Sequence, residues 1–323
     1  MGCAVADDAV NKVEEFWSHE RQDVRKHNWL EHPIALACIN QRRAGDPNTD
    51  LAAYWRREYL KKPAPLALSL GCGFGSWERI CFKENLAERI EAYDVSEPAV
   101  NQARIYAEAA GFGDRVIYKA ADLNVLELPE GRYDAIFGIS SLHHVTALEH
   151  VTALERLFEN CRRALKPSGL MFVDEYVGPK RFQSSDRVVQ LINRLIARLP
   201  ERYRRSVYLN GEPRQTYLNT PLDWFEQNDP SEAIRSDEIF PCLRQHFEIL
   251  DYKPYGGALM HMLLSGTAGN FNPGSEEDAS LMRMLAFFEE ELEKAGVIGT
   301  DFASAVCRPL PQPTRLQKLF GKI

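Results

Sequence analysis

Apolar residues recur along the chain at two different spacings, which predict strands and helices in alternation. The strands predicted from short apolar runs are residues 66–70, 89–94, 116–120, 133–139 and 170–174. The helices predicted between them from amphipathic stretches are residues 76–88, 98–110 and 147–165. Strands that alternate with helices form parallel sheets with right-handed crossovers. This part of the chain therefore predicts an α/β core.

The pattern continues on both sides of this core. Two helices are predicted at 8–30 and 50–60, and the prolines of the segment 61–65 then stop helix formation. Apolar runs at 247–252 and 258–264 predict two more strands, and 276–295 predicts a closing helix. We therefore expect a doubly wound, mostly parallel seven-stranded sheet with helices on both faces.

This organisation divides the chain into five segments. We expect an N-terminal helical extension or lid (1–63), a core (64–175), a helical insertion that forms a lid over the bound partner molecule (176–245), strands and a helix that complete the core (246–306), and a tail (307–323). The insertion interrupts the strand–helix rhythm and is rich in arginine.

Composition narrows the classes of partner. The 323 residues carry a net charge of −7, which disfavours a nucleic-acid partner and favours a small molecule. The seven cysteines are scattered and form no Cys-x-x-Cys pair, so we expect reduced thiols, a cytoplasmic protein and no metal site. No run approaches the ~18 apolar residues of a membrane span, so we expect no stable membrane insertion. The oligomeric state stays open.

A glycine-rich turn follows the first core strand and opens the next helix. Gly71, Gly73 and Gly75 allow a ligand to approach the backbone, although a tight turn alone would explain them. Asp94 ends the second strand, where nucleotide-binding folds place the carboxylate that holds the ribose hydroxyls. Asp122 ends the third strand and could accept a hydrogen bond from an adenine amine or merely cap its loop.

In this order, the motifs resemble those of the class I S-adenosylmethionine-dependent methyltransferases, which have a Rossmann-like fold. The resemblance covers residues 64–175 and implies S-adenosylmethionine as cofactor, a reversed last strand, and methyl transfer by direct displacement. It implies that the glycines meet the methionine portion and the ribose. The cofactor-binding residues it implies are Gly71, Gly73, Gly75, Asp94, Val95, Asp122, Leu123 and Ile139.

One position departs from the family pattern. Ser69 stands where these enzymes usually carry an acidic residue, two positions before the first glycine. Backbone groups, water or another side chain must then recognise the amino group of the cofactor. A nicotinamide dehydrogenase, the rival use of such a turn, prefers glycine where this chain has Ser76.

The ends of the fourth and fifth strands offer candidates for handling the methyl acceptor. His143 and His144 follow the fourth strand and could act as a general base, or could simply bond to the loop. Glu175 is a third catalytic candidate, and Tyr176 and Arg181 are candidates for binding the acceptor. We therefore expect O- or N-methylation of a small molecule. The alternatives are a non-catalytic module that binds S-adenosylmethionine, or transfer of another group from a modified cofactor.

Overall fold

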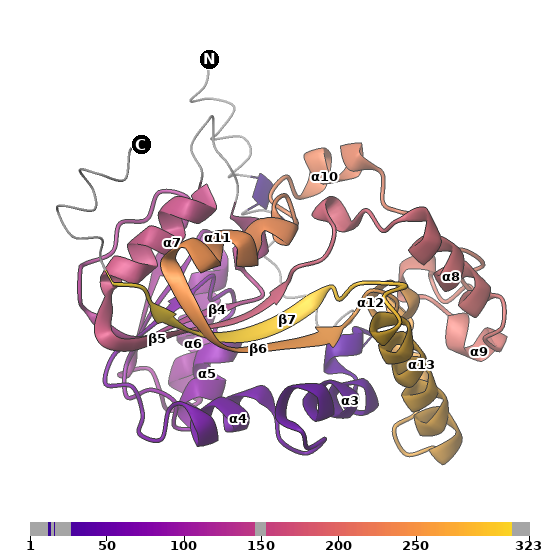
Figure 1. Ribbon diagram of the computed structural model, residues 1–323, viewed down its shortest axis with the longest axis horizontal. Helices are drawn as coiled ribbons and strands as arrows, with labels where there is room; N and C mark the ends of the chain where they lie inside the picture. Colours follow the sequence, from indigo (N-terminus) through magenta and orange to yellow (C-terminus); the bar gives the residue numbers. More distant parts are fainter. Residues whose placement is uncertain (1–11, 14–15, 17–26, 146–152, 312–323) are drawn as a thin grey trace.

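A seven-stranded sheet with the order β3-β2-β1-β4-β5-β7-β6 forms the centre of the protein (Figure 1). The computed structural model describes residues 12–13, 16, 27–145 and 153–311. The strands are β1 (Ala67–Leu70), β2 (Ile90–Asp94), β3 (Val116–Ala120), β4 (Tyr133–Ile139), β5 (Leu165–Tyr176), β6 (Phe247–Gly256) and β7 (Phe302–Pro309). The prediction of seven strands is confirmed.

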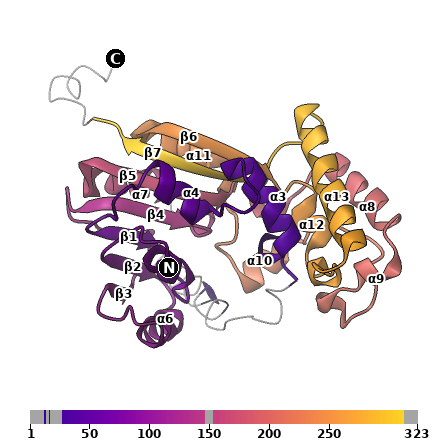
Figure 2. The same ribbon diagram turned by 90° about the horizontal axis from the view of Figure 1, so that it is seen from below.

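The sheet is mixed, so the prediction of a mostly parallel sheet is wrong. Strands β3, β2, β1, β4 and β5 pair in parallel, whereas β7 runs antiparallel to both β5 and β6. The reversed last strand implied by the family resemblance is therefore present. It lies between two strands that precede it in the chain (Figure 2).

The last two strands were only partly predicted. The stretch 258–264 forms a loop and the short helix α12 (Met260–Leu264). The prediction of a strand there was wrong, because a short and mostly apolar stretch does not distinguish a strand from a buried helix. Strand β7 was missed, and it crosses the predicted boundary between residues 306 and 307. Its small residues are buried on both faces of the sheet, so its sequence lacks the alternation of a half-exposed strand.

Helices pack on both faces of the sheet and also beyond the ends of its strands. The described residues form α3 (Pro33–Ala44), α4 (Leu51–Glu58), α5 (Ser76–Lys83), α6 (Glu97–Ala109), α7 (Ala153–Ala164), α8 (Asp186–Ile196), α9 (Glu201–Arg204), α10 (Leu222–Asn228), α11 (Ile239–His246), α12 and α13 (Glu276–Lys294). One apolar core joins the sheet to α7 and α11, and a second joins it to α4, α5 and α6. Helix α3 was not predicted; it begins with Pro33 at its first position and ends at the left-handed Gly45.

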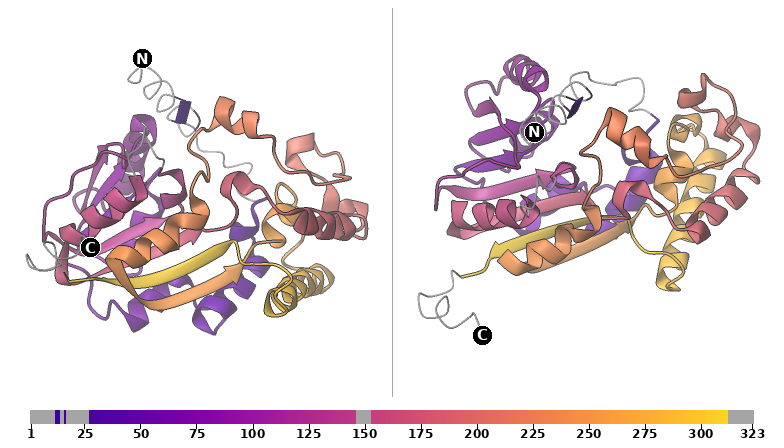
Figure 3. Two further views of the ribbon diagram at one scale, coloured as in Figure 1. Left: turned by 45° about the horizontal axis from the view of Figure 1, so that its top comes forward. Right: turned by 90° about the horizontal axis from the view of Figure 1, so that it is seen from above.

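A third apolar core lies beyond the ends of β5, β6 and β7 (Figure 3). It unites α3, α8, α12 and α13, which come from widely separated parts of the sequence. The predicted insertion and the C-terminal helix therefore share one core. We call the part of the molecule built around this third core the second lobe. It adjoins the edge of the sheet at which the candidate site residues lie.

Some predictions concern residues outside the described ranges. Most of the helix expected at 8–30 and most of the tail at 307–323 lie there, as does the first part of the helix expected at 147–165. The assignment of 1–63 and of 176–245 as lids stays a prediction. Within the ranges that are described, no helix has the length and apolar character needed to span a bilayer.

Candidate active site

The glycine-rich turn connects β1 to α5 and has three glycines in the left-handed region. Their φ angles are 67° at Gly71, 47° at Gly73 and 73° at Gly75. A Cβ on Gly71 would lie 2.3 Å from the Cβ of Ser141, whereas a Cβ on Gly73 would meet no described atom within 4 Å. The backbone of the turn is therefore packed against Ser141 at Gly71, whereas at Gly73 there is free space beside it. A ligand can approach the backbone at the open position.

Asp94 ties this turn to the end of β2. Its carboxylate accepts hydrogen bonds from the backbone N–H groups of Gly73, over 2.7 Å, and Ser96, over 2.9 Å. Burial raises the pKa of Asp94, although these two donors and the nearby His144 act in the opposite direction. The structure thus places a carboxylate directly beside the open part of the turn.

The remaining predicted cofactor residues lie at the same edge of the sheet. Val95 follows β2, Asp122 and Leu123 follow β3, and Ile139 ends β4. The Asp122 carboxylate accepts hydrogen bonds from the backbone and side-chain nitrogens of Asn124, over 2.8 and 2.7 Å, so it does cap its loop. Sheet topology brings these residues together because the carboxyl ends of neighbouring parallel strands meet at one edge.

Glu78 is a buried acid that the sequence reasoning missed. It lies in the first turn of α5 with no exposed surface, and neither carboxylate oxygen accepts a hydrogen bond of ordinary geometry from a described residue. Burial raises the pKa of Glu78 to about 7, although the neighbouring hydroxyl of Ser69 favours the ionised form. A carboxylate therefore lies behind the glycine turn even though Ser69 itself has none. Its position within a helical apolar pattern gave no signal.

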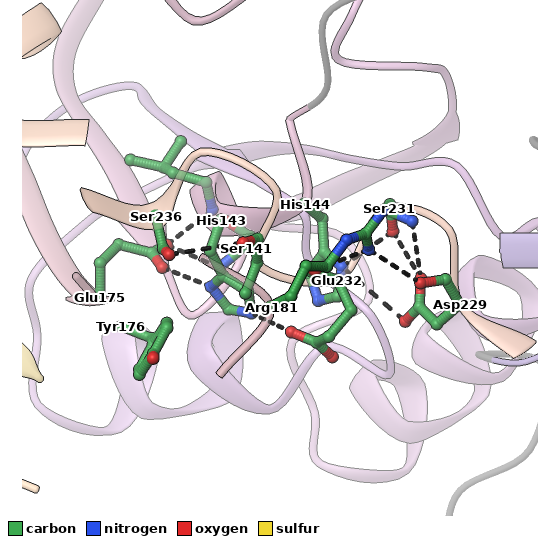
Figure 4. Close-up of polar contacts among 12 residues, drawn as sticks. Ser141, His143, His144, Glu175, Tyr176, Arg181, Asp229, Ser231, Glu232 and Ser236 are labelled. Atoms are coloured by element: carbon green, nitrogen blue, oxygen red, sulfur yellow. Dashed lines mark hydrogen bonds and ion pairs between the residues drawn. The ribbon is translucent and has the colours of Figure 1, made fainter. Parts of the chain in front are cut away.

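On the acceptor side, Glu175 holds His143 in place. The Glu175 side chain is fully buried at the end of β5, and its Oε1 accepts the backbone N–H groups of Ser141 and Leu142, over 2.6 and 2.7 Å. Its Oε2 lies 2.6 Å from Nδ1 of His143 (Figure 4). Both carboxylate oxygens of Glu175 are therefore engaged by the loop after β4. The catalytic role expected for Glu175 stays a prediction, as do those of His143 and His144.

His144 is held through a second set of contacts. Its Nδ1 lies 2.9 Å from Oγ of Ser231, and that hydroxyl donates to Asp229 over 2.7 Å. Because the hydroxyl of Ser231 donates its proton to Asp229, Nδ1 of His144 must donate the hydrogen bond to the oxygen of Ser231. Burial lowers the pKa of His144.

Glu232 completes the cluster from the insertion. Its Oε1 lies 3.4 Å from Nε2 of His143, without the geometry of a hydrogen bond. Burial raises the pKa of Glu232 to about 7. Asp229, Ser231 and Glu232 were not among the predicted site residues, because the segment 229–232 reads as a polar turn that starts a helix. The contacts across the site, to residues 143 and 144, have no local sequence signal.

Arg181 positions this loop of the insertion. Its guanidinium donates to the backbone carbonyls of Asp229, Pro230 and Glu232, over 3.3, 2.8 and 2.8 Å. Burial lowers the pKa of Arg181. In this arrangement the guanidinium is engaged by the protein, and its predicted contact with the acceptor stays a prediction.

Tyr176 belongs to an aromatic group beside the histidines. Its hydroxyl donates to the carbonyl of Pro179 over 2.8 Å, and its ring contacts those of His143, Phe182 and Phe302. His261 also contacts this group, and burial lowers its pKa to about 4. The wall next to the histidine pair is therefore apolar and aromatic.

Comparison with known proteins assigns the core. Residues 67–169 match the family described as "Methyltransferase domain". The crystal structure of geranyl diphosphate C-methyltransferase from Streptomyces coelicolor superposes with a TM-score of 0.51 at 14% identity, covering 94% of this chain and 98% of that one. The fold is therefore that of the class I S-adenosylmethionine-dependent methyltransferases.

Curated relatives match in the same region. A sterol 24-C-methyltransferase of Gibberella zeae is 30% identical over 125 residues, which are 39% of this chain and 31% of the relative. A phosphoethanolamine N-methyltransferase of Plasmodium falciparum is 24% identical over 125 residues, 39% of this chain and 44% of the relative. A 27-O-demethylrifamycin SV methyltransferase of Amycolatopsis mediterranei is 27% identical over 110 residues, 34% and 38% of the two chains. The matches span less than half the length of these relatives.

Proposed function

We propose that this protein transfers the methyl group of S-adenosylmethionine to a small-molecule acceptor. The observation that carries the proposal is the juxtaposition at one sheet edge of the open glycine turn, held by Asp94, and the histidine pair, held by Glu175 and Ser231. The matching methyltransferase domain supports the same reaction.

The residues at the turn fit this cofactor. The open position at Gly73 allows close approach of a ligand, and the carboxylate of Asp94 keeps acceptor capacity for ribose hydroxyls beyond its two backbone donors. The buried carboxylate of Glu78 supplies the negative charge that Ser69 lacks, and we assign to it recognition of the cofactor ammonium group. The adenine and the ribose of the cofactor would be enclosed by Val95, Asp122, Leu123 and Ile139.

When bound, the cofactor supplies an electrophilic methyl group on a sulfonium. The protein's contribution is to orient an acceptor atom toward that methyl group and to exclude water, because displacement depends on alignment of the reacting atoms. The aromatic wall of Tyr176, Phe182 and His261 favours an acceptor with an apolar or aromatic body. His143 and His144 then face its reacting polar group. We propose an oxygen or nitrogen acceptor, and the polar side chains of His143, His144 and Glu232 beside the glycine turn support this proposal.

Calorimetric titration with S-adenosylmethionine and its demethylated product tests this function. We expect Asp94→Ala to weaken binding of both about 10- to 100-fold, because charge-assisted hydrogen bonds contribute roughly 1.5–3 kcal/mol. Asp114→Ala, at an exposed aspartate between α6 and β3, is the matched control and should bind like the wild type. A wild-type protein that binds neither compound would overturn the proposal. Mass spectrometry of acceptor mixtures then detects methylated products.

A further inference from the structure

Three potential metal ligands converge beside the cofactor edge. His143, His144 and Glu232 each offer a ligand atom, and these atoms all lie within 4.8 Å of one another. The two histidines come from the short helix η2 (Leu142–His144) after β4, and Glu232 comes from the insertion. Figure 4 shows the three side chains gathered at one point, with Glu175 and Asp229 outside them. We call these three residues the two-histidine cluster.

Each histidine has an oxygen partner on its Nδ1. Glu175 accepts two backbone N–H groups and faces Nδ1 of His143, so Nδ1 donates to this carboxylate and Nε2 is the ring nitrogen that can bind an ion. The Nδ1 of His144 faces Ser231, which is bonded in turn to Asp229. Metal-binding histidines almost always have such a partner on the other ring nitrogen, because it fixes the tautomer and the orientation of the ring.

The inner side of the cluster brings electron pairs together. Nε2 of His143 and Oε1 of Glu232 are 3.4 Å apart, and this oxygen has no hydrogen-bond partner among the described residues. A ring nitrogen that faces a buried carboxylate oxygen is stable only with a proton or a metal ion between them. Two ligand atoms bound about 2.1 Å from one ion at a tetrahedral angle would be separated by roughly this distance.

We propose that His143, His144 and Glu232 bind one divalent transition-metal ion and leave a coordination position for an oxygen atom of the acceptor. Two imidazoles and one carboxylate suit zinc, iron or manganese better than magnesium or calcium, which prefer oxygen ligands alone. The ion would balance the charge of Glu232 and link the core to the insertion, where Arg181 holds the carbonyl of Glu232.

The catalytic consequence rests on the proposed methyl transfer. A hydroxyl of the acceptor loses its proton to solvent more readily when its oxygen coordinates a divalent ion. That oxygen forms a bond to the methyl carbon while the carbon–sulfur bond breaks, and the bonding electron pair returns to sulfur as a neutral thioether. His143 and His144 then serve as ligands, and the acceptor class is a hydroxyl compound.

Metal binding is measurable without activity. Tag-free protein is stripped with a chelator and titrated with Zn²⁺ in a calorimeter, and Co²⁺ is added to a second sample to record its visible absorption. We expect one equivalent of each ion. We expect His143→Gln and Glu232→Gln to weaken Zn²⁺ binding at least tenfold and to alter the Co²⁺ spectrum. His246→Gln, at a histidine paired with Glu159 on α7, is the matched control and should bind like the wild type.

Cofactor binding separates the possible failures. Each variant is also titrated with S-adenosylmethionine and heated to record its Tm, so that a misfolded variant is recognised. Wild-type protein that binds the cofactor but no stoichiometric Zn²⁺ or Co²⁺ would overturn the metal site and leave the proposed function standing. Equal metal affinity in the wild type and in folded Glu232→Gln would also overturn it. If the wild-type protein does not bind S-adenosylmethionine at all, the proposed function itself is refuted.

Discussion

At the scale of single residues, Gly71 and Gly73 share a left-handed conformation but differ in what surrounds them. The Cβ of an alanine would collide with Ser141 at position 71, whereas position 73 is open. Sequence alone predicts both glycines as cofactor residues and does not distinguish a steric requirement of the protein from one of the ligand.

Alanine substitution at each glycine separates the two requirements. We expect Gly71→Ala to lower the free energy of unfolding by about 3 kcal/mol or more, since strain and overpacking both contribute. We expect Gly73→Ala to cost about 1–2 kcal/mol from backbone strain alone, yet to weaken cofactor binding at least tenfold. Urea unfolding and calorimetry measure the two effects. Equal losses of stability would contradict the assignment.

The raised pKa of Glu78 predicts that the stability of the protein depends on pH. Its folded pKa of about 7 lies above the ordinary value of 4.5, so the folded state retains a proton that the unfolded chain releases. This group therefore makes the free energy of unfolding fall as pH rises from about 4.5 to about 7.

The test is Glu78→Gln. We expect the variant to be more stable at pH 8 by about 1–3 kcal/mol, with little difference at pH 4.5. We also expect it to bind S-adenosylmethionine at least tenfold more weakly, because the charge for the ammonium group is gone. Urea unfolding at both pH values measures the change in stability, and titration with S-adenosylmethionine at pH 8 measures the change in affinity. Unchanged affinity would remove Glu78 from the site.

These residues show what the sequence could and could not provide at the site. Gly71, Gly73 and Asp94 were predictable because each follows a strand within a local motif. Glu78, Asp229 and Glu232 were not, because their significance comes from burial and from partners distant in sequence, such as the contact between residues 143 and 232. Local sequence patterns do not predict contacts between residues that are distant in the sequence.

At the scale of elements, the parallel half of the sheet was predictable and the antiparallel half was not. Helices separate strands β1 to β5 along the chain, except between β3 and β4, and this alternation predicted a parallel sheet. The run 258–264 was predicted to be a strand and β7 was missed, because both stretches are mostly buried and neither shows a clear period of two or 3.6 residues.

One ion pair joins α7 to the insertion. Arg235, just before helix η5 (Ser236–Glu238), donates to both carboxylate oxygens of Glu155, over 2.9 and 2.7 Å. Its guanidinium lowers the pKa of Glu155 to about 2. Since the folded pKa is depressed, the stabilisation is complete above the ordinary pKa of 4.5 and is lost as pH falls toward 2.

Glu155→Gln should therefore lower the free energy of unfolding by about 1–2 kcal/mol at pH 7 and by much less near pH 3. The matched control is Glu130→Gln, which removes an exposed ion pair with Arg163 and should change stability by less than about 0.5 kcal/mol. Urea unfolding at the two pH values is the measurement. A penalty of equal size at pH 3 would show that the ion pair is not its cause.

At the scale of the whole molecule, the second lobe is fastened to the sheet through a buried ion pair. Arg43 of α3 donates to both oxygens of Asp174 on β5, over 2.6 and 2.9 Å, and its guanidinium lies 3.6 Å from the ring centroid of Tyr255. Both charged side chains are mostly buried. The pair connects a helix that precedes the core with the strand that carries Glu175.

Removing one partner should cost more than removing both. We expect Arg43→Met to lower the free energy of unfolding by about 3–5 kcal/mol, because it leaves the Asp174 carboxylate buried without its cation. The double variant Arg43→Met/Asp174→Asn should recover at least about 1 kcal/mol of that loss. Chemical denaturation of the single and double variants tests the coupling. Additive penalties would contradict it.

The position of β7 also bears on the order in which the protein can be assembled during synthesis. Among the described strands, β6 pairs with β7 alone, and β7 lies between β5 and β6. Until residues 302–309 have left the ribosome, β5 lacks a neighbour on one edge and β6 lacks one on both. The growing chain thus has open strand edges until residues 302–309 have emerged, and such edges can pair with other chains.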